Sequence, residues 1–150
     1  MTAQPESPSA RTTGSCLCGK ITFETIGAPI SNCLCFCNSC RKHTGSIGMA
    51  NSWYTKENFR ILTGNDIMHT YEDRSPDSGG MIERSFCSAC GSTLIAENKK
   101  LFPGAVIVPA GAMEIDPAGQ SWAPSSEYFC KRKAPWFQTP SETTKYTELF

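Results

Sequence analysis

Nine cysteines are the residues of this 150-residue chain whose spacing points most clearly to chemistry. Two short motifs, Cys16-Leu17-Cys18-Gly19 and Cys87-Ser88-Ala89-Cys90-Gly91, each end in glycine. Glycine permits a positive φ, which curls the backbone so that amide N–H groups can face two neighbouring sulfurs. Structural zinc takes four ligands, and four thiolates are a usual set. We therefore predict one zinc site, closing a loop of about seventy residues, from Cys16, Cys18, Cys87 and Cys90; the alternative is free buried cysteines.

A second cluster is denser and runs Cys33-Leu34-Cys35-Phe36-Cys37-Asn38-Ser39-Cys40. Side chains alternate on an extended segment, so Cys33, Cys35 and Cys37 are expected on one face, with Cys40 returning from the start of a turn. Three thiolates would leave one position of a zinc ion open, as in a catalytic site, whereas four would close it as a structural site. The spacing leaves both possibilities open.

The open form of this second cluster favours thiol chemistry. Zinc with three thiolates is formally −1, so it is a weak Lewis acid, but a thiol that coordinates it is deprotonated outright. A free thiol has a pKa of about 8.5, so little thiolate is present at neutral pH without such help. Addition of a thiol to a carbonyl, or its reversal, therefore fits the site better than direct hydrolysis.

Polar residues near the cysteines could assist, although each has an ordinary structural role as its alternative. Arg41 and Lys42 follow the last cysteine of the cluster and could hold a substrate carboxylate, or simply be solvated. His43 could move protons, whereas His69 and Cys130 are expected to be structural. The remaining candidates are Ser46 and Ser92 as hydrogen-bond donors or turn caps, and Lys131, Arg132 and Lys133 beside Trp136 and Phe137 as an anion-binding patch or a solvated strand end.

Composition limits the partners and the compartment. Fourteen basic and fourteen acidic residues give no net charge, which argues against nucleic acid or an anionic membrane as the main partner. The longest apolar stretch, from Gly104 to Met113, is far short of the roughly 20 residues of a membrane span. Met1 to Gly14 is polar and lacks the apolar region of a secretory signal. With an odd number of cysteines, a reducing, cytoplasmic location is expected.

The elements that would position these residues are short strands. We predict a mainly β domain over 14–140, between a disordered leader over 1–13 and a C-terminal tail over 141–150. Alternating apolar residues predict a strand over 20–26, and turn-forming residues 64–66 predict a hairpin between strands 59–63 and 67–71. The other predicted elements are strands over 82–86, 93–96, 105–108 and 127–130, one helical turn over 38–43, and a turn or flexible flap over 73–80.

The motifs taken in order resemble the glutathione-dependent formaldehyde-activating enzyme family, to which centromere protein V is related. The matching strings are S-C-L-C-G-K-I-T-F, C-F-C-N-S-C-R-K-H-T-G-S, S-F-C-S-A-C-G-S-T-L, V-P-A-G-A-M-E-I-D, and S-S-E-Y-F ahead of A-P-W-F, over about Gly14 to Phe137. The resemblance implies small coiled antiparallel sheets, shared with a zinc-binding Rab accessory factor, and two zinc ions. By position, the structural ion would be held by Cys16, Cys18, Cys87 and Cys90, and the active-site ion by Cys35, Cys37 and Cys40.

Two positions depart from the family pattern. Phe36 stands where the family usually has histidine, and Cys33 is an extra thiol that could cap the open position or act as a redox guard. The family's reaction is the condensation of glutathione with formaldehyde.

We therefore expect a zinc-dependent carbon–sulfur lyase, of the S-(hydroxymethyl)glutathione synthase type, acting on the adduct of glutathione or another thiol with an aldehyde. Its partners would be small molecules, and an oligomer is possible. The expected catalytic residues are Cys35, Cys37, Cys40 and Arg41. The alternatives are a zinc-stabilised protein-binding module and an enzyme of the same fold that carries out proton transfer, elimination or rearrangement on a specialised metabolite; for the latter, Glu83 or Glu97 would face the open zinc.

Overall fold

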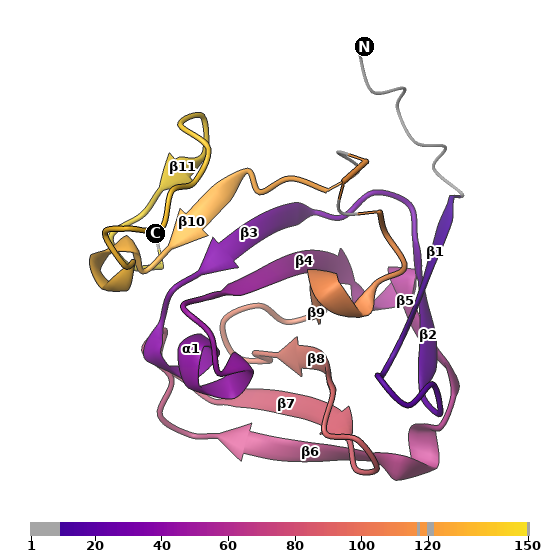
Figure 1. The fold of residues 1–150 in the computed structure, drawn as a ribbon. Coiled ribbons are helices and arrows are strands. Elements are labelled where there is room, and N and C mark those ends of the chain that lie inside the picture. Colours follow the sequence, from indigo (N-terminus) through magenta and orange to yellow (C-terminus); the bar gives the residue numbers. More distant parts are fainter. Residues whose placement is uncertain (1–9, 117, 120–121, 150) are drawn as a thin grey trace.

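The described residues form two β-sheets and one short α-helix (Figure 1). The computed structural model describes residues 10–116, 118–119 and 122–149. A three-stranded sheet has the order β1-β2-β5, and an eight-stranded sheet has the order β11-β10-β3-β4-β9-β8-β7-β6. The strands are β1 (Arg11–Ser15), β2 (Thr22–Ile26), β3 (Ser31–Cys35), β4 (Met49–Thr55), β5 (Phe59–Thr63), β6 (Met68–Asp73), β7 (Ile82–Cys87), β8 (Thr93–Glu97), β9 (Ala105–Pro109), β10 (Ser126–Tyr128) and β11 (Thr144–Lys145).

The helices are short, and they connect strands. The α-helix α1 (Asn38–Thr44) lies between β3 and β4. Four single-turn 3-10 helices are η1 (Lys56–Asn58), η2 (Asn65–Ile67), η3 (Ala110–Ala112) and η4 (Cys130–Arg132). None of the helices among the described residues is long and apolar enough to cross a membrane. The predicted mainly β fold is confirmed, although β10 pairs in parallel with β3 and β11.

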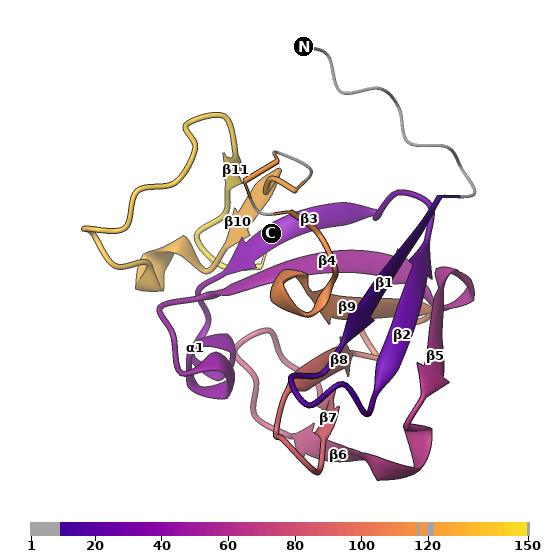
Figure 2. The same cartoon turned by 45° about the vertical axis from the view of Figure 1, so that its right-hand side comes forward.

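The main core joins the two sheets. Phe23 of β2 is fully buried and its ring lies 5.4 Å from that of Phe59 on β5. From the larger sheet, Val106 and Val108 of β9 are buried in the same cluster. Figure 2 shows the strands of the smaller sheet running steeply across those of the larger one. Val106 and Val108 are two residues apart, so both project from the same face of β9 into this core.

The predicted hairpin of strands 59–63 and 67–71 is wrong. β5 pairs with β2, and β6 pairs with β7, so the two strands belong to different sheets. Gly64 has φ 78° and is the N-cap of η2, which redirects the chain instead of reversing it. At the end of β5, the hydroxyl groups of Thr63 and Thr22 lie 2.7 Å apart, which fixes the strand to β2.

Strands lie on both sides of the bounds predicted for the domain. Residues 11–13 of the predicted leader belong to β1, which begins at Arg11, and the guanidinium of Arg11 pairs with the buried Glu24 of β2. Residues 1–9 of that leader lie outside the described residues. The tail predicted over 141–150 carries β11, so it forms one edge of the larger sheet.

A buried carboxylate attaches this C-terminal segment to the sheet. Glu127 of β10 has no exposed side-chain surface and accepts hydrogen bonds from Lys133 Nζ and Thr139 Oγ1, both at 2.9 Å, and from Thr143 Oγ1. Lys145 Nζ lies 3.2 Å from its other oxygen. Burial alone would raise the pKa of Glu127, but the hydrogen bonds, led by that of Thr143, outweigh it and lower the pKa to about 2.

Replacing Glu127 by glutamine is expected to lower the free energy of unfolding by about 3 kcal/mol at neutral pH, because two lysines would lose their buried partner. A carboxyl whose pKa is lower in the folded state stabilises above its unfolded pKa, here about 4.5, and loses that contribution as the pH falls toward 2. Urea unfolding of wild type and E127Q should show a gap that narrows below about pH 4.5. Glu57→Gln, at an exposed position, is the control; a gap of constant size would contradict this account.

Candidate functional site

Four cysteines from two distant turns form the first candidate metal centre. Cys16 and Cys18 lie between β1 and β2, whereas Cys87 ends β7 and Cys90 follows it. Their sulfurs all lie within 4.8 Å of one another, with Cys16 Sγ 3.5 Å from Cys18 Sγ and Cys18 Sγ 3.8 Å from Cys87 Sγ. Zinc–sulfur bonds of about 2.3 Å put the corners of a tetrahedron about 3.8 Å apart. The residues therefore fit a four-thiolate zinc.

The backbone around this centre is shaped for thiolates. Gly19 and Gly91 have φ of 76° and 78°, as the two motifs predict, and each closes its turn with a hydrogen bond to a cysteine carbonyl. Ile21 N donates to Cys16 Sγ at 3.3 Å. Ser92 joins the two turns, because its hydroxyl accepts from Leu17 N at 2.8 Å and lies 3.2 Å from Cys90 Sγ. The centre thus links the two sheets.

The second candidate centre is a group of three sulfurs at the end of β3 and the start of α1, hereafter the sulfur trio: Cys35, Cys37 and Cys40. The three sulfurs lie within 4.8 Å of one another. Cys37 is the N-cap of α1, and its Sγ accepts a hydrogen bond from Cys40 N at 3.3 Å. The helical turn predicted over 38–43 is present and brings Cys40 back toward the strand.

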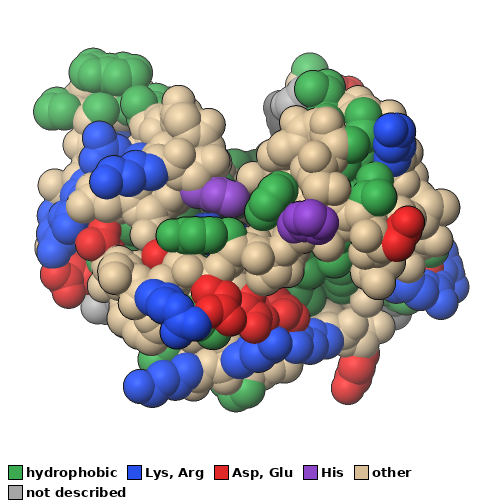
Figure 3. Space-filling view, turned by 90° about the horizontal axis from the view of Figure 1, so that it is seen from below, with side chains coloured by type: hydrophobic (Ala, Val, Ile, Leu, Met, Phe, Trp, Pro, Cys, Tyr) green, Lys and Arg blue, Asp and Glu red, His purple; other side chains and the backbone are tan. Residues whose placement is uncertain are grey.

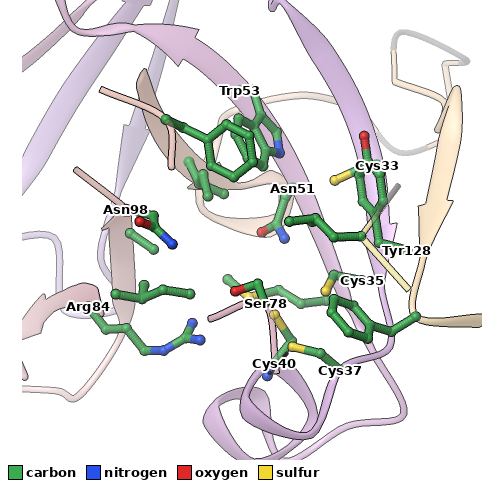
Figure 4. A pocket seen from close by; sticks show the side chains of 17 residues that line it. Cys33, Cys35, Cys37, Cys40, Asn51, Trp53, Ser78, Arg84, Asn98 and Tyr128 are labelled. Atoms are coloured by element: carbon green, nitrogen blue, oxygen red, sulfur yellow. Dashed lines mark hydrogen bonds between the residues drawn. The ribbon is translucent and has the colours of Figure 1, made fainter. Parts of the chain in front are cut away.

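Cys33 lies apart from the sulfur trio. The prediction that Cys33, Cys35 and Cys37 share one face is wrong for Cys37, which has left the strand and caps α1. Cys33 is buried on β3 and lines the same pocket, but it is outside the group of sulfurs close enough to share an ion (Figure 4). Burial raises the pKa of its thiol to about 11. The geometry therefore favours three thiolate ligands over four.

The sulfurs of the trio are too close to ionise together unless a cation lies among them. The pKa of Cys37 falls to about 3, chiefly because its thiolate accepts hydrogen bonds from the Cys35 and Cys40 thiols. The same contacts raise the pKa of Cys35. One negative charge is thus shared by the three sulfurs, and a second would need a positive partner. Zinc is a suitable partner, since it binds cysteine as thiolate.

A narrow pocket opens beside the sulfur trio (Figure 4). The cavity has a volume of about 60 Å³, which leaves room for only a few water molecules. Its walls are mostly apolar, and its polar wall residues come from β4, β7, the loop after β6 and the position directly after β8. The polar residues are Asn51, Trp53, Ser78, Arg84 and Asn98. Such a cavity suits a small reactive group beside the sulfurs rather than a whole peptide.

Arg84, not Arg41, is the cation of this pocket. Arg41 is exposed on α1, donates to Asn38 Oδ1 at 3.2 Å, and is absent from the pocket walls. Arg84 is only 3% exposed and lies on β7 two residues after Ile82, another wall residue. Its spacing of two from Ile82 in the predicted strand was a signal, because a buried charge usually has a partner or a function. The pairing of the strands was needed to show that this side of the strand is buried.

The other candidates from the sequence are exposed or make contacts with neighbouring structure, and none of them lines the pocket of the sulfur trio. His43 Nε2 lies 2.9 Å from Thr93 Oγ1, and burial lowers the pKa of His43. His69 is exposed and edge-on to Phe86. Ser46 is exposed, and Cys130 donates to the carbonyl of Glu127 at 3.6 Å. Figure 3 shows the histidine side chains among hydrophobic ones, with acidic and basic side chains intermixed along one rim of that face.

The basic run does not form a free anion-binding patch. Lys131, Arg132 and Lys133 pair with Glu148, Asp77 and Glu127, respectively. Trp136 is exposed beside Phe137. The carboxylates proposed for the alternative enzyme also turn elsewhere: Glu83 pairs with Lys99 at 2.6 Å and Glu97 with Lys56 at 2.8 Å, and neither lines the pocket of the sulfur trio.

Phe36 packs away from the pocket, although it lies between two cysteines of the trio. Its ring is buried, with Lys133 Nζ 5.7 Å from its centroid and the Phe137 ring edge-on at 6.2 Å. It does not line the pocket beside the trio. A phenylalanine at this position therefore changes the packing behind the site and leaves the pocket wall unchanged.

Comparison with known proteins gives one family and one similar fold. The family model described as glutathione-dependent formaldehyde-activating enzyme matches residues 11–132, which include both cysteine clusters. A curated Halomonas elongata protein, whose name assigns it provisionally as a glutathione-dependent formaldehyde-activating enzyme, is 30% identical over 82 residues, or 54% of this chain and 52% of that protein. The chain thus spans about half the length of this curated relative.

A crystal structure of a Rhodobacter sphaeroides protein has a similar fold, with a TM-score of 0.58 and 18% sequence identity. The likeness covers 75% of this chain and 97% of that one. At this identity it shows a common fold alone.

Proposed function

Because the chain belongs to the glutathione-dependent formaldehyde-activating enzyme family, we propose that it joins the thiol of glutathione, or of a similar small molecule, to a small aldehyde, or catalyses the reverse reaction. The observation that carries this proposal is the sulfur trio of Cys35, Cys37 and Cys40, which has three possible ligands for one ion and a narrow pocket beside it. The four-cysteine centre would hold a second, structural zinc.

The chain's residues would divide the task between binding and shielding. Zinc held by the trio would supply a position at which a thiol is bound as its thiolate. The pocket walls, which include Met49, Ile107 and Phe129, would exclude bulk water from the reacting atoms. A volume of about 60 Å³ admits the thiol end and a small aldehyde, so the peptide body of glutathione would lie outside the pocket. A cytoplasmic location belongs to this proposal, since thiolate ligands must stay reduced.

The test is exchange NMR on zinc-loaded protein mixed with glutathione and formaldehyde. We expect the exchange between free aldehyde and hemithioacetal to be faster than in buffer, in proportion to protein concentration. A mixture containing the same amount of free zinc controls for catalysis by the ion in solution. Exchange at the buffer rate in the presence of fully loaded protein would rule out this reaction.

Replacing Cys33 by serine is expected to leave two zinc ions per chain. Cys33 lies outside the group of sulfurs that are close enough to share one ion, so its loss removes no ligand. Elemental analysis of purified wild type and C33S would measure this directly, with Cys130→Ser as the matched control outside both centres. A fall to one zinc in C33S alone would show that Cys33 closes the second site, as in a purely structural protein.

A further inference from the structure

Three buried polar atoms in the pocket of the sulfur trio have no hydrogen-bond partner. They are Asn51 Oδ1, Trp53 Nε1 and Arg84 Nη2, and they are three of the five such side-chain atoms found among the described residues. An unpaired buried polar group costs about 1–3 kcal/mol, so native proteins contain few of them. Their gathering on the walls of one small cavity indicates a ligand that carries oxygen.

Arg84 is held so that one side of its guanidinium is available to such a ligand. Its Nε donates to Asp73 Oδ2 at 3.1 Å, and Nη2 lies 3.1 Å from the same oxygen without the geometry of a hydrogen bond. Asp73 thus fixes the side chain from one side. Figure 4 shows the guanidinium pointing toward Ser78 and Cys40. Arginine stays protonated at any physiological pH, so this donor is permanent.

The other two unpaired atoms, on Asn51 and Trp53, belong to residues that line the same pocket. Asn51 projects from β4 toward the middle of the pocket, between Trp53 and the sulfur trio (Figure 4). Trp53 Nε1 can only donate a hydrogen bond, whereas Asn51 Oδ1 accepts one. The pocket therefore offers a ligand two kinds of donor, on Arg84 and Trp53, and an acceptor on Asn51.

We propose that Arg84 is a catalytic residue that binds the aldehyde oxygen and stabilises the negative charge it gains as the carbon–sulfur bond forms. This inference rests on the proposed function. The thiolate sulfur attacks the carbonyl carbon, and the π pair of the C=O bond moves onto the oxygen beside Arg84. That oxygen then takes the proton that the thiol released, by way of water, and the product is a neutral hemithioacetal. Arg84 remains protonated throughout, Asp73 positions it, and the reverse reaction uses the same contacts.

The first test compares Arg84→Gln and Arg84→Lys with wild type, each with its zinc content measured. Removing one such donor typically lowers kcat by about 10²–10³-fold. We expect kcat/KM for the aldehyde to fall at least about a hundredfold in R84Q with two zincs bound. R84K keeps the positive charge but not the planar guanidinium, so its kcat/KM should lie between those of R84Q and wild type. Arg74→Gln is the control at an exposed arginine; it should match wild type.

The second test needs no variant and measures binding. Sodium formate is a one-carbon anion that can take the place of the charged oxygen. On titration of zinc-loaded wild type, we expect the NMR signals of the Arg84 guanidinium to shift, and the affinity for formate to fall at least about tenfold in R84Q. If R84Q fails to fold, the wild-type titration and R84K still decide the question.

The outcomes separate this inference from the proposed function. The role of Arg84 would be overturned if zinc-loaded R84Q accelerated the reaction as wild type does, or if formate did not shift the NMR signals of Arg84. Either result would leave the proposed function in place. No acceleration by loaded wild type would remove both.

Discussion

Replacing Cys87 by serine is expected to unfold the protein or to lower its free energy of unfolding by at least about 5 kcal/mol, because binding of structural zinc contributes about 10–16 kcal/mol in small zinc-folded peptides. That is comparable to the whole stability of a domain of this size. Cys87 is fully buried in the core, and its sulfur lies 3.8 Å from Cys18 Sγ, which comes from the turn after β1. Losing this ligand would free the smaller sheet from the larger one.

Urea unfolding together with elemental analysis would measure this effect. Cys130→Ser is the control, since Cys130 is a partly buried cysteine that belongs to neither cysteine centre. We expect C87S to retain at most one zinc and C130S to retain two. The account of the four-cysteine centre would be wrong if C87S bound two zincs and unfolded at the same urea concentration as C130S.

Replacing Cys40 by alanine is expected to have the second large effect, the loss of acceleration down to the buffer rate. Alanine removes one of three ligands, so the ion of the sulfur trio should be lost or held too weakly to purify with the protein. The four-cysteine centre would remain. The free energy of unfolding should therefore fall much less than in C87S, because the trio links only β3 and α1 and not the two sheets.

The measurements are the exchange NMR rate, the zinc content and the urea midpoint of C40A. C33S, at a buried cysteine of the same pocket, is the comparison for zinc content. Two zincs and undiminished acceleration in C40A would place the reaction elsewhere in the molecule.

Local spacing accounts for the parts of the site that could be predicted from sequence. Cysteines two or three residues apart can meet at one ion only if the backbone turns, and Gly19 and Gly91 provide the turn with positive φ. The strand over 59–63 has the predicted bounds, and the predicted turn over 38–43 is helical. These features depend on neighbours in the chain, so they can be inferred without the fold.

The errors arose where contacts between distant residues decide the structure. The strands on either side of Gly64 look like a hairpin locally, but β2 and β7 are their partners. Residues 49–55 show no clean alternation, because Asn51 and Ser52 are both buried polar residues. No strand is therefore predicted from the sequence over 49–55, where β4 lies. Asn51 lines the pocket, so one of the residues that obscured the strand pattern belongs to the candidate site.

The position of Arg84 could not be deduced for the same reason. In the sequence it is one of fourteen basic residues, whereas Arg41 follows a cysteine motif directly. Only the register of β6, β7 and β8 shows that Arg84 lies opposite Tyr71 and Ala96 and is buried. The cysteine motif thus identified the sulfur trio from the sequence, whereas the pairing of the strands was needed to identify Arg84 as the cation of the pocket.

Cadmium NMR of the protein with both centres loaded with cadmium would test the central claim most directly, because each bound ion gives its own resonance. We predict two resonances, of which only one, from the ion held by Cys35, Cys37 and Cys40, shifts when glutathione is added. Cys40→Ala should lack that resonance and keep the other. Two resonances that are both unaffected by glutathione would show that neither ion has a position for a thiol, and would contradict the account.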